Sequence, residues 1–217
     1  FREARLISSE QVRLIPGSGV DTDRFLPANG APSSDQFRIV LPARLLWDKG
    51  IGELVEAARL LRKQNIPVSV WLAGEPDAGN PATVPVEQLE AWQQLGLVKW
   101  LGKLEDMPAL FQSVNAVVLP SYREGLPKSL IEAAACALPL ITTDAPGCRE
   151  VVTHDVDGLL VPPRDAKALA EAIERLAGDP ALCRRLGEAA RRKALAEFDE
   201  RIVIDRTVAV YKELMPA

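Results

Sequence analysis

The sequence predicts an α/β fold in which a doubly wound parallel sheet is followed by a helical tail. Short apolar runs of strand composition alternate with amphipathic or Ala-rich segments as far as about residue 162, the pattern of consecutive βαβ units. From residue 163 onward only helix signals remain. We therefore expect a single domain over residues 1–217, with an α/β core at about 12–162 and a helical tail at about 163–217.

The expected strands are short apolar runs bounded by Gly, Pro or polar residues. The runs at 37–41 and 115–120 each lead into a loop and then a helix, an order typical of parallel sheets. In chain order, the expected strands are residues 12–15, 37–41, 68–72, 98–101, 115–120, 139–142 and 158–161.

Helices are expected between these strands, and the clearest covers residues 51–64. Its apolar residues recur at spacings of three and four, which marks one buried face. They are Ile51, Leu54, Val55, Ala58 and Leu61. The other expected helices are 86–95, 107–113, 130–137, where Pro127 fits the first helical position, and 147–152.

Capping residues predict where the helices of the tail begin. Asp165 fits the N-cap of a helix that runs to about residue 177. Asp179 and Pro180 fit the cap and the first position of the next helix. A final helix is expected over about 199–214.

The composition of the chain excludes several classes of binding partner and site. The chain of 217 residues is 47% hydrophobic, enough to bury a sizeable core. With a net charge of −4 and no dense Lys/Arg tract, a nucleic-acid partner is not expected. Three cysteines and one histidine form neither a disulfide set nor a zinc site, which indicates a reducing cytoplasm. No apolar run approaches the roughly 18 residues of a membrane span, and no signal peptide is expected.

Two carboxylates surround the start of the helix after the 115–120 strand. A helix at this place would direct its free amides to the carboxyl edge of the sheet, where a diphosphate could bind for about 0.3–2 kcal/mol. With the diphosphate on the amides near Lys128 and Ser129, Glu124 and Glu132 could each accept hydrogen bonds from a pair of sugar hydroxyls. The alternative is that both are solvated surface carboxylates.

Two cations follow the 37–41 strand. Arg44 and Lys49 are five residues apart in a strand-to-helix connection, which allows both to reach the same phosphates while Gly50 relaxes the backbone. Taken alone, the two cations could equally be surface charges.

The Glu124 to Glu132 segment, followed by Ala-Ala-Ala, resembles the double-glutamate signature of retaining GT-B glycosyltransferases of family 4. Further segments resemble blocks of the donor-binding half of that family, in the same order. They are Ile15 to Phe25, the phosphate-binding element Pro42 to Gly50, the strand Val98 to Gly102, Thr143 to Glu150, and Asp157 to Val161.

The resemblance implies a role for each matching residue. Glu124, Arg44 and Lys49 would be catalytic, with Glu124 facing the donor sugar and the two cations neutralising the diphosphate leaving group. Glu132 would hold the ribose hydroxyls, and the strand end would touch the nucleotide base. The donor-binding residues are Glu132, Gly125, Leu126, Lys128, Ser129, Leu101 and Gly102. Many relatives carry Gly near position 127; Pro127 donates no amide, so Lys128 and Ser129 must supply the cradle.

The resemblance further implies that these residues form the Rossmann-like C-terminal half of a GT-B fold. The N-terminal acceptor domain is expected to be absent, since Phe1-Arg-Glu-Ala-Arg reads as mid-protein sequence. The isolated half would therefore be inactive. The implied donor is a nucleotide-diphosphate sugar, with UDP-sugar as the leading choice. The implied acceptor is a glycan or lipid-linked molecule, bound through the missing domain during surface polysaccharide, lipopolysaccharide or glycoconjugate synthesis.

Neither a cofactor nor a metal is expected, because fixed cations and helix amides would stabilise the charge of the leaving group. The resemblance implies a cytoplasmic protein that works at the inner membrane face. Asp21-Thr-Asp23 is read as turn chemistry rather than a metal site. Two alternatives stay open: a non-catalytic scaffold that binds a nucleotide sugar, and a sugar-nucleotide epimerase. A glycogen-type phosphorylase is disfavoured, because no lysine here fits a pyridoxal phosphate site.

Other conspicuous residues favour structural roles. His154 lies in a polar turn far from the donor blocks, and Glu150 is expected to order its own loop or helix. Trp47 lies in the phosphate loop and is expected to border the ligand. Trp71, Trp92 and Trp100 are expected to pack in the core.

Overall fold

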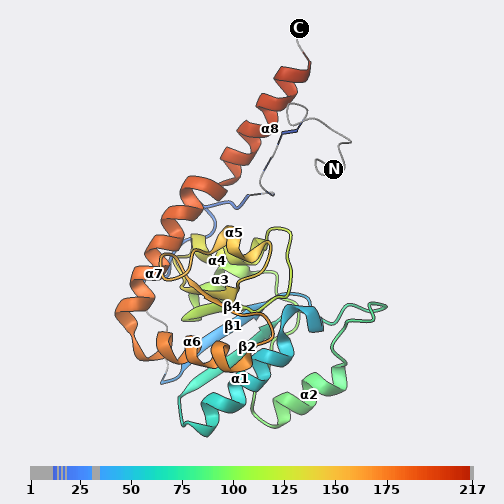
Figure 1. Cartoon of the computed structure of the whole chain (residues 1–217), viewed down its shortest axis with the longest axis vertical. Helices are drawn as coiled ribbons and strands as arrows, with labels where there is room; N and C mark the ends of the chain where they lie inside the picture. Colours follow the sequence, from blue (N-terminus) through green and yellow to red (C-terminus); the bar gives the residue numbers. More distant parts are fainter. Residues whose placement is uncertain (1–11, 14, 16, 18, 31–34, 216–217) are drawn as a thin grey trace.

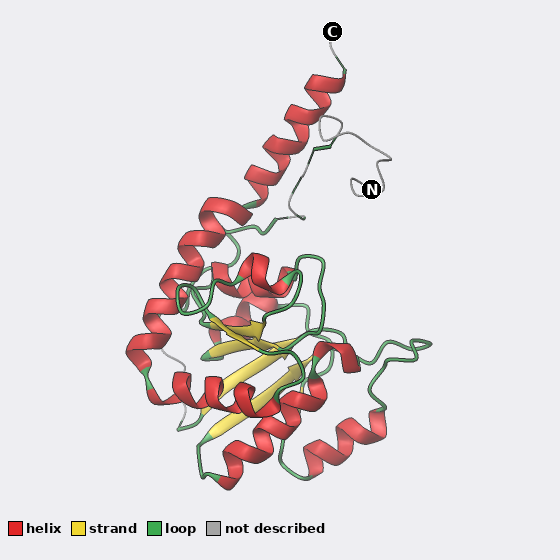
Figure 2. Cartoon of the chain, in the orientation of Figure 1, coloured by secondary structure: helices red, strands yellow, loops and turns green. Residues whose placement is uncertain are grey.

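A six-stranded parallel sheet forms the centre of the molecule (Figure 1, Figure 2). The computed structural model describes residues 12–13, 15, 17, 19–30 and 35–215. The strand order is β3-β2-β1-β4-β5-β6. The strands are β1 (Phe37–Pro42), β2 (Val68–Ala73), β3 (Lys99–Trp100), β4 (Ala116–Leu119), β5 (Leu140–Thr143) and β6 (Leu159–Val161).

The strand order reverses between β1 and β4, which are neighbours in the sheet. In their register, Ile39 lies opposite Ala116 and Val40 opposite Val117. Such a reversal leaves a crevice at the carboxyl ends of the two strands, because the connections leave toward opposite faces of the sheet. The loops after β1 and β4 therefore meet at the position where open α/β sheets bind ligands.

Helices cover both faces of the sheet. α1 packs against α6 and β2, whereas α4 packs against α7, β4 and β5. The helices of the α/β region are α1 (Ile51–Lys63), α2 (Val86–Gln94), α3 (Met107–Gln112), α4 (Lys128–Ala135) and α5 (Cys148–Val151), with a 3-10 turn, η2, at Trp47–Lys49. The doubly wound parallel fold predicted from the sequence is confirmed.

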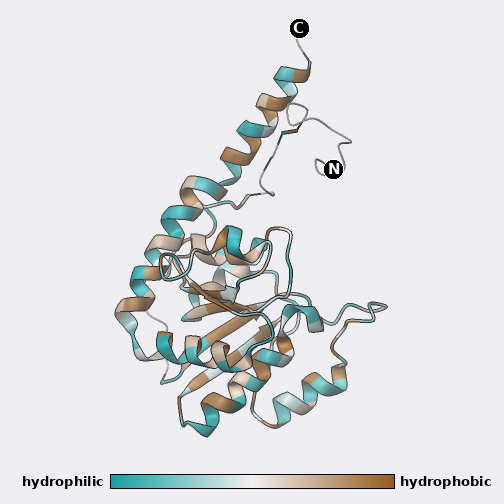
Figure 3. Ribbon diagram, in the orientation of Figure 1, coloured by the Kyte–Doolittle hydropathy of each residue, from teal (hydrophilic) through white to brown (hydrophobic). Residues whose placement is uncertain are grey.

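The core lies between the sheet and these helices. Every residue of β4 is at most 1% exposed, which explains why its sequence, Ala-Val-Val-Leu, is apolar without alternation. Figure 3 shows the central strands as the most hydrophobic part of the ribbon. None of the described helices is long and apolar enough to cross a lipid bilayer.

Three capped helices and a π-helical turn form the tail. The carboxylate of Asp165 accepts the amide of Ala168 at 2.9 Å, and that of Asp179 accepts the amide of Leu182 at 2.9 Å. Both predicted caps are confirmed. The elements are α6 (Ala166–Gly178), α7 (Pro180–Lys193), the turn η3 (Ala194–Phe198) and α8 (Glu200–Leu214), which projects away from the sheet in Figure 1.

Two local predictions are wrong. The expected strand at 12–15 is not formed by its described residues, Val12, Arg13 and Ile15, while Leu14 lies outside the described residues. Pro127 is the N-cap of α4 rather than its first helical residue, with an extended ψ of 100°.

Candidate functional site

The loops that follow β1 and β4 are joined at the switch point of the sheet. The amide of Tyr122 donates to the carbonyl oxygen of Asp48 at 2.9 Å. Gly50, with a φ of +71°, lets the first loop come close to β4. A Cβ added there would clash with the carbonyl oxygen of Pro120. These contacts place η2 beside the segment that carries Glu124.

Lys49 and Glu124 form an ion pair across the two loops. The Nζ atom of Lys49 donates to Oε1 of Glu124 at 2.8 Å, and the side chains are only 14% and 15% exposed. The hydroxyl of Ser121, which is fully buried, lies 2.6 Å from the same oxygen. The other oxygen of Glu124, Oε2, has no hydrogen bond to the described chain. The carboxylate is thus held by one of its two oxygens.

The backbone of Glu124 is anchored by the loop after β5. Its amide donates to the carbonyl oxygen of Pro146 at 2.9 Å. Gly147, with a φ of +85°, lies so close that a Cβ would clash with the carbonyl oxygen of Glu124. The side chain of Glu150 accepts the amide of Gly147 at 2.6 Å. The structural role expected for Glu150 is confirmed.

Glu132 lies in the second turn of α4 and is partly buried. Burial raises the pKa of its carboxyl, while the positive charges of Lys128 and Arg24 act in the opposite direction. Its side chain makes no hydrogen bond within the described part of the chain. Arg24 escaped the sequence analysis, because its approach to Glu132 depends on the fold. Glu132 is therefore a partly desolvated acceptor whose oxygens are not used by the described chain.

Arg44 and Lys49 do not share a partner in the structure. The Nη1 atom of Arg44 lies 2.6 Å from Oδ2 of Asp77, and the Arg44 side chain is 67% exposed. Each cation is instead paired with a different carboxylate. Asp77 follows β2, the strand next to β1, so the loop after β2 supplies the carboxylate that meets Arg44.

The remaining predicted residues fall at two places. Gly125 and Leu126 lie in the loop before α4, and the amides of Lys128 and Ser129 donate no hydrogen bond within the described chain. Leu101 and Gly102 lie at the end of β3, two strands away from β1, where the carbonyl oxygen of Gly102 accepts the amide of Gly74 at 2.8 Å. The free amides at the start of α4 face the same sheet edge as the ion pair.

The tryptophans and the histidine largely have structural contacts. Trp47 is 38% exposed and packs edge-on against Trp92, with ring centroids 5.9 Å apart. The indole of Trp100 donates to the carbonyl oxygen of Gly74 at 2.9 Å. Nδ1 of His154 accepts the amide of Leu160 at 3.0 Å, so this nitrogen is occupied in a turn.

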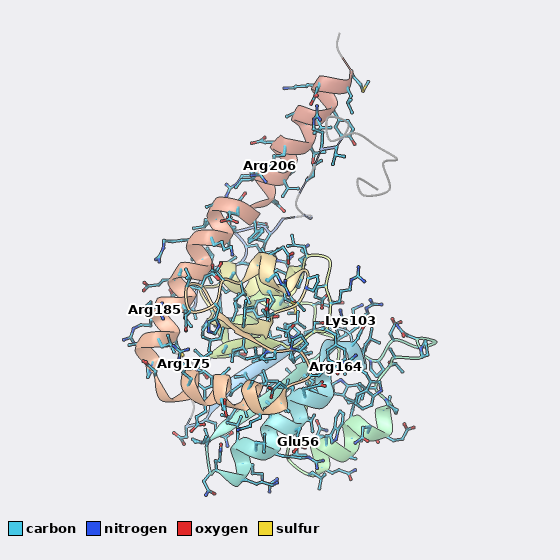
Figure 4. The ribbon with its side chains drawn as sticks, in the orientation of Figure 1. Glu56, Lys103, Arg164, Arg175, Arg185 and Arg206 are labelled. Carbon is cyan, nitrogen blue, oxygen red and sulfur yellow. The ribbon has the colours of Figure 1, made fainter. Side chains whose placement is uncertain are left out.

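A second polar network, missed from the sequence, includes Tyr122, which follows Ser121 in the loop after β4. The hydroxyl of Tyr122 donates to Oε1 of Glu53 at 2.6 Å, while Oε2 of Glu53 is buried without a partner among the described residues. The guanidinium of Arg164, labelled in Figure 4, lies 4.6 Å from the Tyr122 ring centre. Burial and the Glu53 carboxylate raise the pKa of Tyr122 to about 12, so it is a neutral donor near pH 7. No group of three or more His, Cys, Asp or Glu side chains that could hold a metal occurs in the described ranges.

Comparison with known proteins gives one family. The model of "Glycosyl transferases group 1" matches residues 23–193. An N-acetylgalactosaminyltransferase of Campylobacter jejuni, named as acting on N,N'-diacetylbacillosaminyl-diphospho-undecaprenol, is 34% identical over 82% of this chain and 45% of its own length. Glycogen synthase of Mycobacterium tuberculosis is 30% identical over 89% of this chain and 47% of its own. The chain thus spans about half the length of these curated relatives.

Solved structures agree on the fold. Sucrose-phosphate synthase from Thermosynechococcus elongatus superposes with a TM-score of 0.84 at 30% identity, covering 98% of this chain and 56% of that one. The Anabaena protein HepE, in complex with UDP-glucose, gives a TM-score of 0.83 at 24% identity, with 97% and 60% covered. The second likeness is one of fold alone.

Proposed function

The chain belongs to the glycosyl transferases group 1 family, and from this premise we propose that it is the half of a retaining GT-B enzyme that binds a nucleotide-diphosphate sugar. The observation that carries the proposal is the partly buried Lys49–Glu124 pair at the switch point. A cation and a carboxylate with little exposure, beside the free amides of α4, suit a ligand that has both phosphates and hydroxyls.

In the proposed reaction, the bond between the anomeric carbon and the diphosphate breaks, and negative charge develops on the leaving phosphate. Lys49 and the amides of Lys128 and Ser129 stabilise that charge, because fixed cations and dipoles need no reorganisation as the charge develops. Arg44 joins them by leaving Asp77; this exchange is small in energy because the ion pair is exposed. We propose that neither a cofactor nor a metal ion is required.

The two glutamates bind different parts of the rest of the donor. Glu132 accepts the ribose hydroxyls, and Glu124 accepts hydroxyls of the sugar. Hydrogen bonds to such charged acceptors contribute about 1.5–3 kcal/mol each. We take UDP as the nucleotide of the donor.

The acceptor belongs to the remainder of the enzyme. The C. jejuni relative is named for a lipid-linked acceptor, and a capsular polysaccharide glycosyltransferase of Staphylococcus aureus is 27% identical over 84% of this chain. These names support transfer to a surface glycan or lipid-linked acceptor at the inner membrane face. The acceptor site would lie in the additional length that the relatives have.

Calorimetric titration of the chain with UDP, with GDP and ADP as controls and EDTA present throughout, tests the proposal. We expect saturable binding of UDP, and Glu132→Ala should weaken it because the ribose loses its acceptor. Preference for GDP or ADP would change the proposed nucleotide of the donor but would leave the proposal of a glycosyltransferase intact. Absence of binding by all three, and by UDP-glucose, would contradict the proposed site.

A further inference from the structure

Lys49 and Glu124 form an ion pair, although the proposed function assigns them to opposite ends of the donor. Lys49 is assigned to the diphosphate and Glu124 to the sugar. In the structure, the two side chains pair with each other at 2.8 Å. We propose that this pair makes the site select an intact nucleotide sugar over the nucleoside diphosphate that remains after transfer. The inference rests on the proposed function.

The first step is the state of Glu124 when Lys49 leaves it. Its Oε1 atom would keep only the Ser121 hydroxyl, at 2.6 Å, and Oε2 has no hydrogen bond to the described residues. The side chain is 15% exposed, so water replaces the lost ammonium only in part. Removing one partner from such a pair is unfavourable, because the remaining charge stays poorly solvated.

The second step compares the two ligands. A nucleoside diphosphate takes Lys49 away from Glu124 and brings further negative charge toward the carboxylate, so both effects oppose binding. An intact donor also takes Lys49, but its sugar hydroxyls donate to Glu124 in place of the ammonium. The unfavourable state therefore arises with the product alone. An enzyme built this way releases its nucleotide product more readily than an enzyme whose Lys49 is free.

The exposed pair of Arg44 and Asp77 supplies a matched comparison on the same sheet edge. Its two atoms are 2.6 Å apart, but the side chains are 67% and 31% exposed, so water solvates either charge when the pair separates. Discrimination is thus expected from Glu124 and not from Asp77. Glu124→Gln and Asp77→Asn remove the same charge, and both keep a side-chain oxygen that can accept a hydrogen bond.

Titration of wild type, Glu124→Gln and Asp77→Asn with UDP, UDP-glucose and UDP-N-acetylgalactosamine, at one pH and ionic strength, tests the inference. We expect Glu124→Gln to bind UDP about tenfold more tightly than wild type, since a charged hydrogen bond no longer competes for Lys49. The preference for a UDP-sugar over UDP should fall by at least the same factor. Asp77→Asn should stay within about twofold of wild type.

The outcomes separate this inference from the proposed function. If Glu124→Gln binds UDP and wild type shows no binding, this result would also support competition between Glu124 and UDP for Lys49. If wild type binds UDP and Glu124→Gln binds it no more tightly than Asp77→Asn does, the inference is overturned and the proposed function stands. Silence of every variant toward all three nucleotides would overturn both. Circular dichroism of each variant establishes that it is folded.

Discussion

At the scale of single residues, the two glutamates of the site are held differently. Glu124 is paired with Lys49 and Ser121, whereas the side chain of Glu132 makes no hydrogen bond within the described chain. Burial raises the pKa of Glu132 above its usual 4.5, with Lys128 and Arg24 opposing the shift. A carboxyl with a raised pKa in the folded state stabilises the protein below its unfolded pKa, and that stability is lost as the pH rises through the folded pKa.

We therefore predict opposite effects of Glu132→Gln on stability and on binding. At neutral pH the variant should melt at a higher temperature than wild type, because it no longer buries an ionised carboxylate, yet it should bind UDP more weakly. As the pH falls through the raised pKa of Glu132, wild type loses affinity by protonation, and the difference between the two proteins should shrink. The terminal phosphate titrates near pH 6 in both experiments and cancels in the comparison. A constant difference in affinity across mildly acidic pH would contradict a role for the ionised group.

At the scale of elements, the site depends on how closely the start of α1 approaches the end of β4. Gly50 caps α1 and ends η2, so it follows Lys49 directly. Its φ of +71° and its contact with the Pro120 carbonyl leave no room for a side chain. The position of Lys49 relative to the end of β4 thus depends on Gly50.

Gly50→Ala should lower stability by more than the roughly 1–2 kcal/mol of a left-handed residue, since the clash also forces the loop away from β4. UDP binding should fall with it, because Lys49 moves with the loop. Gly96→Ala is the control: Gly96 has a similar φ of +65° with nothing within 4 Å of an added Cβ. Urea unfolding and UDP titration of both variants measure the two effects. Equal losses of stability and binding in the two proteins would show that the contact with Pro120 is unimportant.

The elements could be predicted from the sequence where local signals decide. The caps Asp165 and Asp179 and the apolar period of α1 were sufficient to predict these helices. The binding roles of the double-glutamate segment stay a prediction. The ion-pair partners of Lys49 and Arg44 could not be predicted. Lys49 and Glu124 are 75 positions apart, and Arg44 meets Asp77 across 33, so both pairings follow from strand order. The π-helical turn at Ala194–Phe198 gave no local signal either.

At the scale of the whole molecule, the end of the chain separates into an anchored part and a projecting part. Phe198 and Asp199 are about 95% buried, and Val20 exchanges backbone hydrogen bonds with Phe198 and Glu200 at 2.8 and 3.0 Å. The carboxylate of Asp199 accepts hydrogen bonds from Arg201 and from Thr22, and both lower its pKa. Beyond Val203, five large apolar side chains are 41–75% exposed, namely Ile204, Val208, Tyr211 and Leu214 of α8 and Met215 after it.

Two truncations should therefore behave differently. A chain ending at Arg206 keeps every buried residue of the tail, so we expect its unfolding free energy to change by less than about 1 kcal/mol, or about 2–4 °C in Tm, with UDP affinity unchanged. A chain ending at Lys193, where the family match also ends, loses the burial of Phe198, which alone costs about 3–5 kcal/mol. It also loses the Asp199 contacts with Thr22 and Arg201. Thermal unfolding and UDP titration of both chains measure the contrast. If the chain ending at Arg206 melts as low as the shorter one, the exposed part of α8 stabilises the fold, and the anchored segment is not the boundary of the cooperative unit.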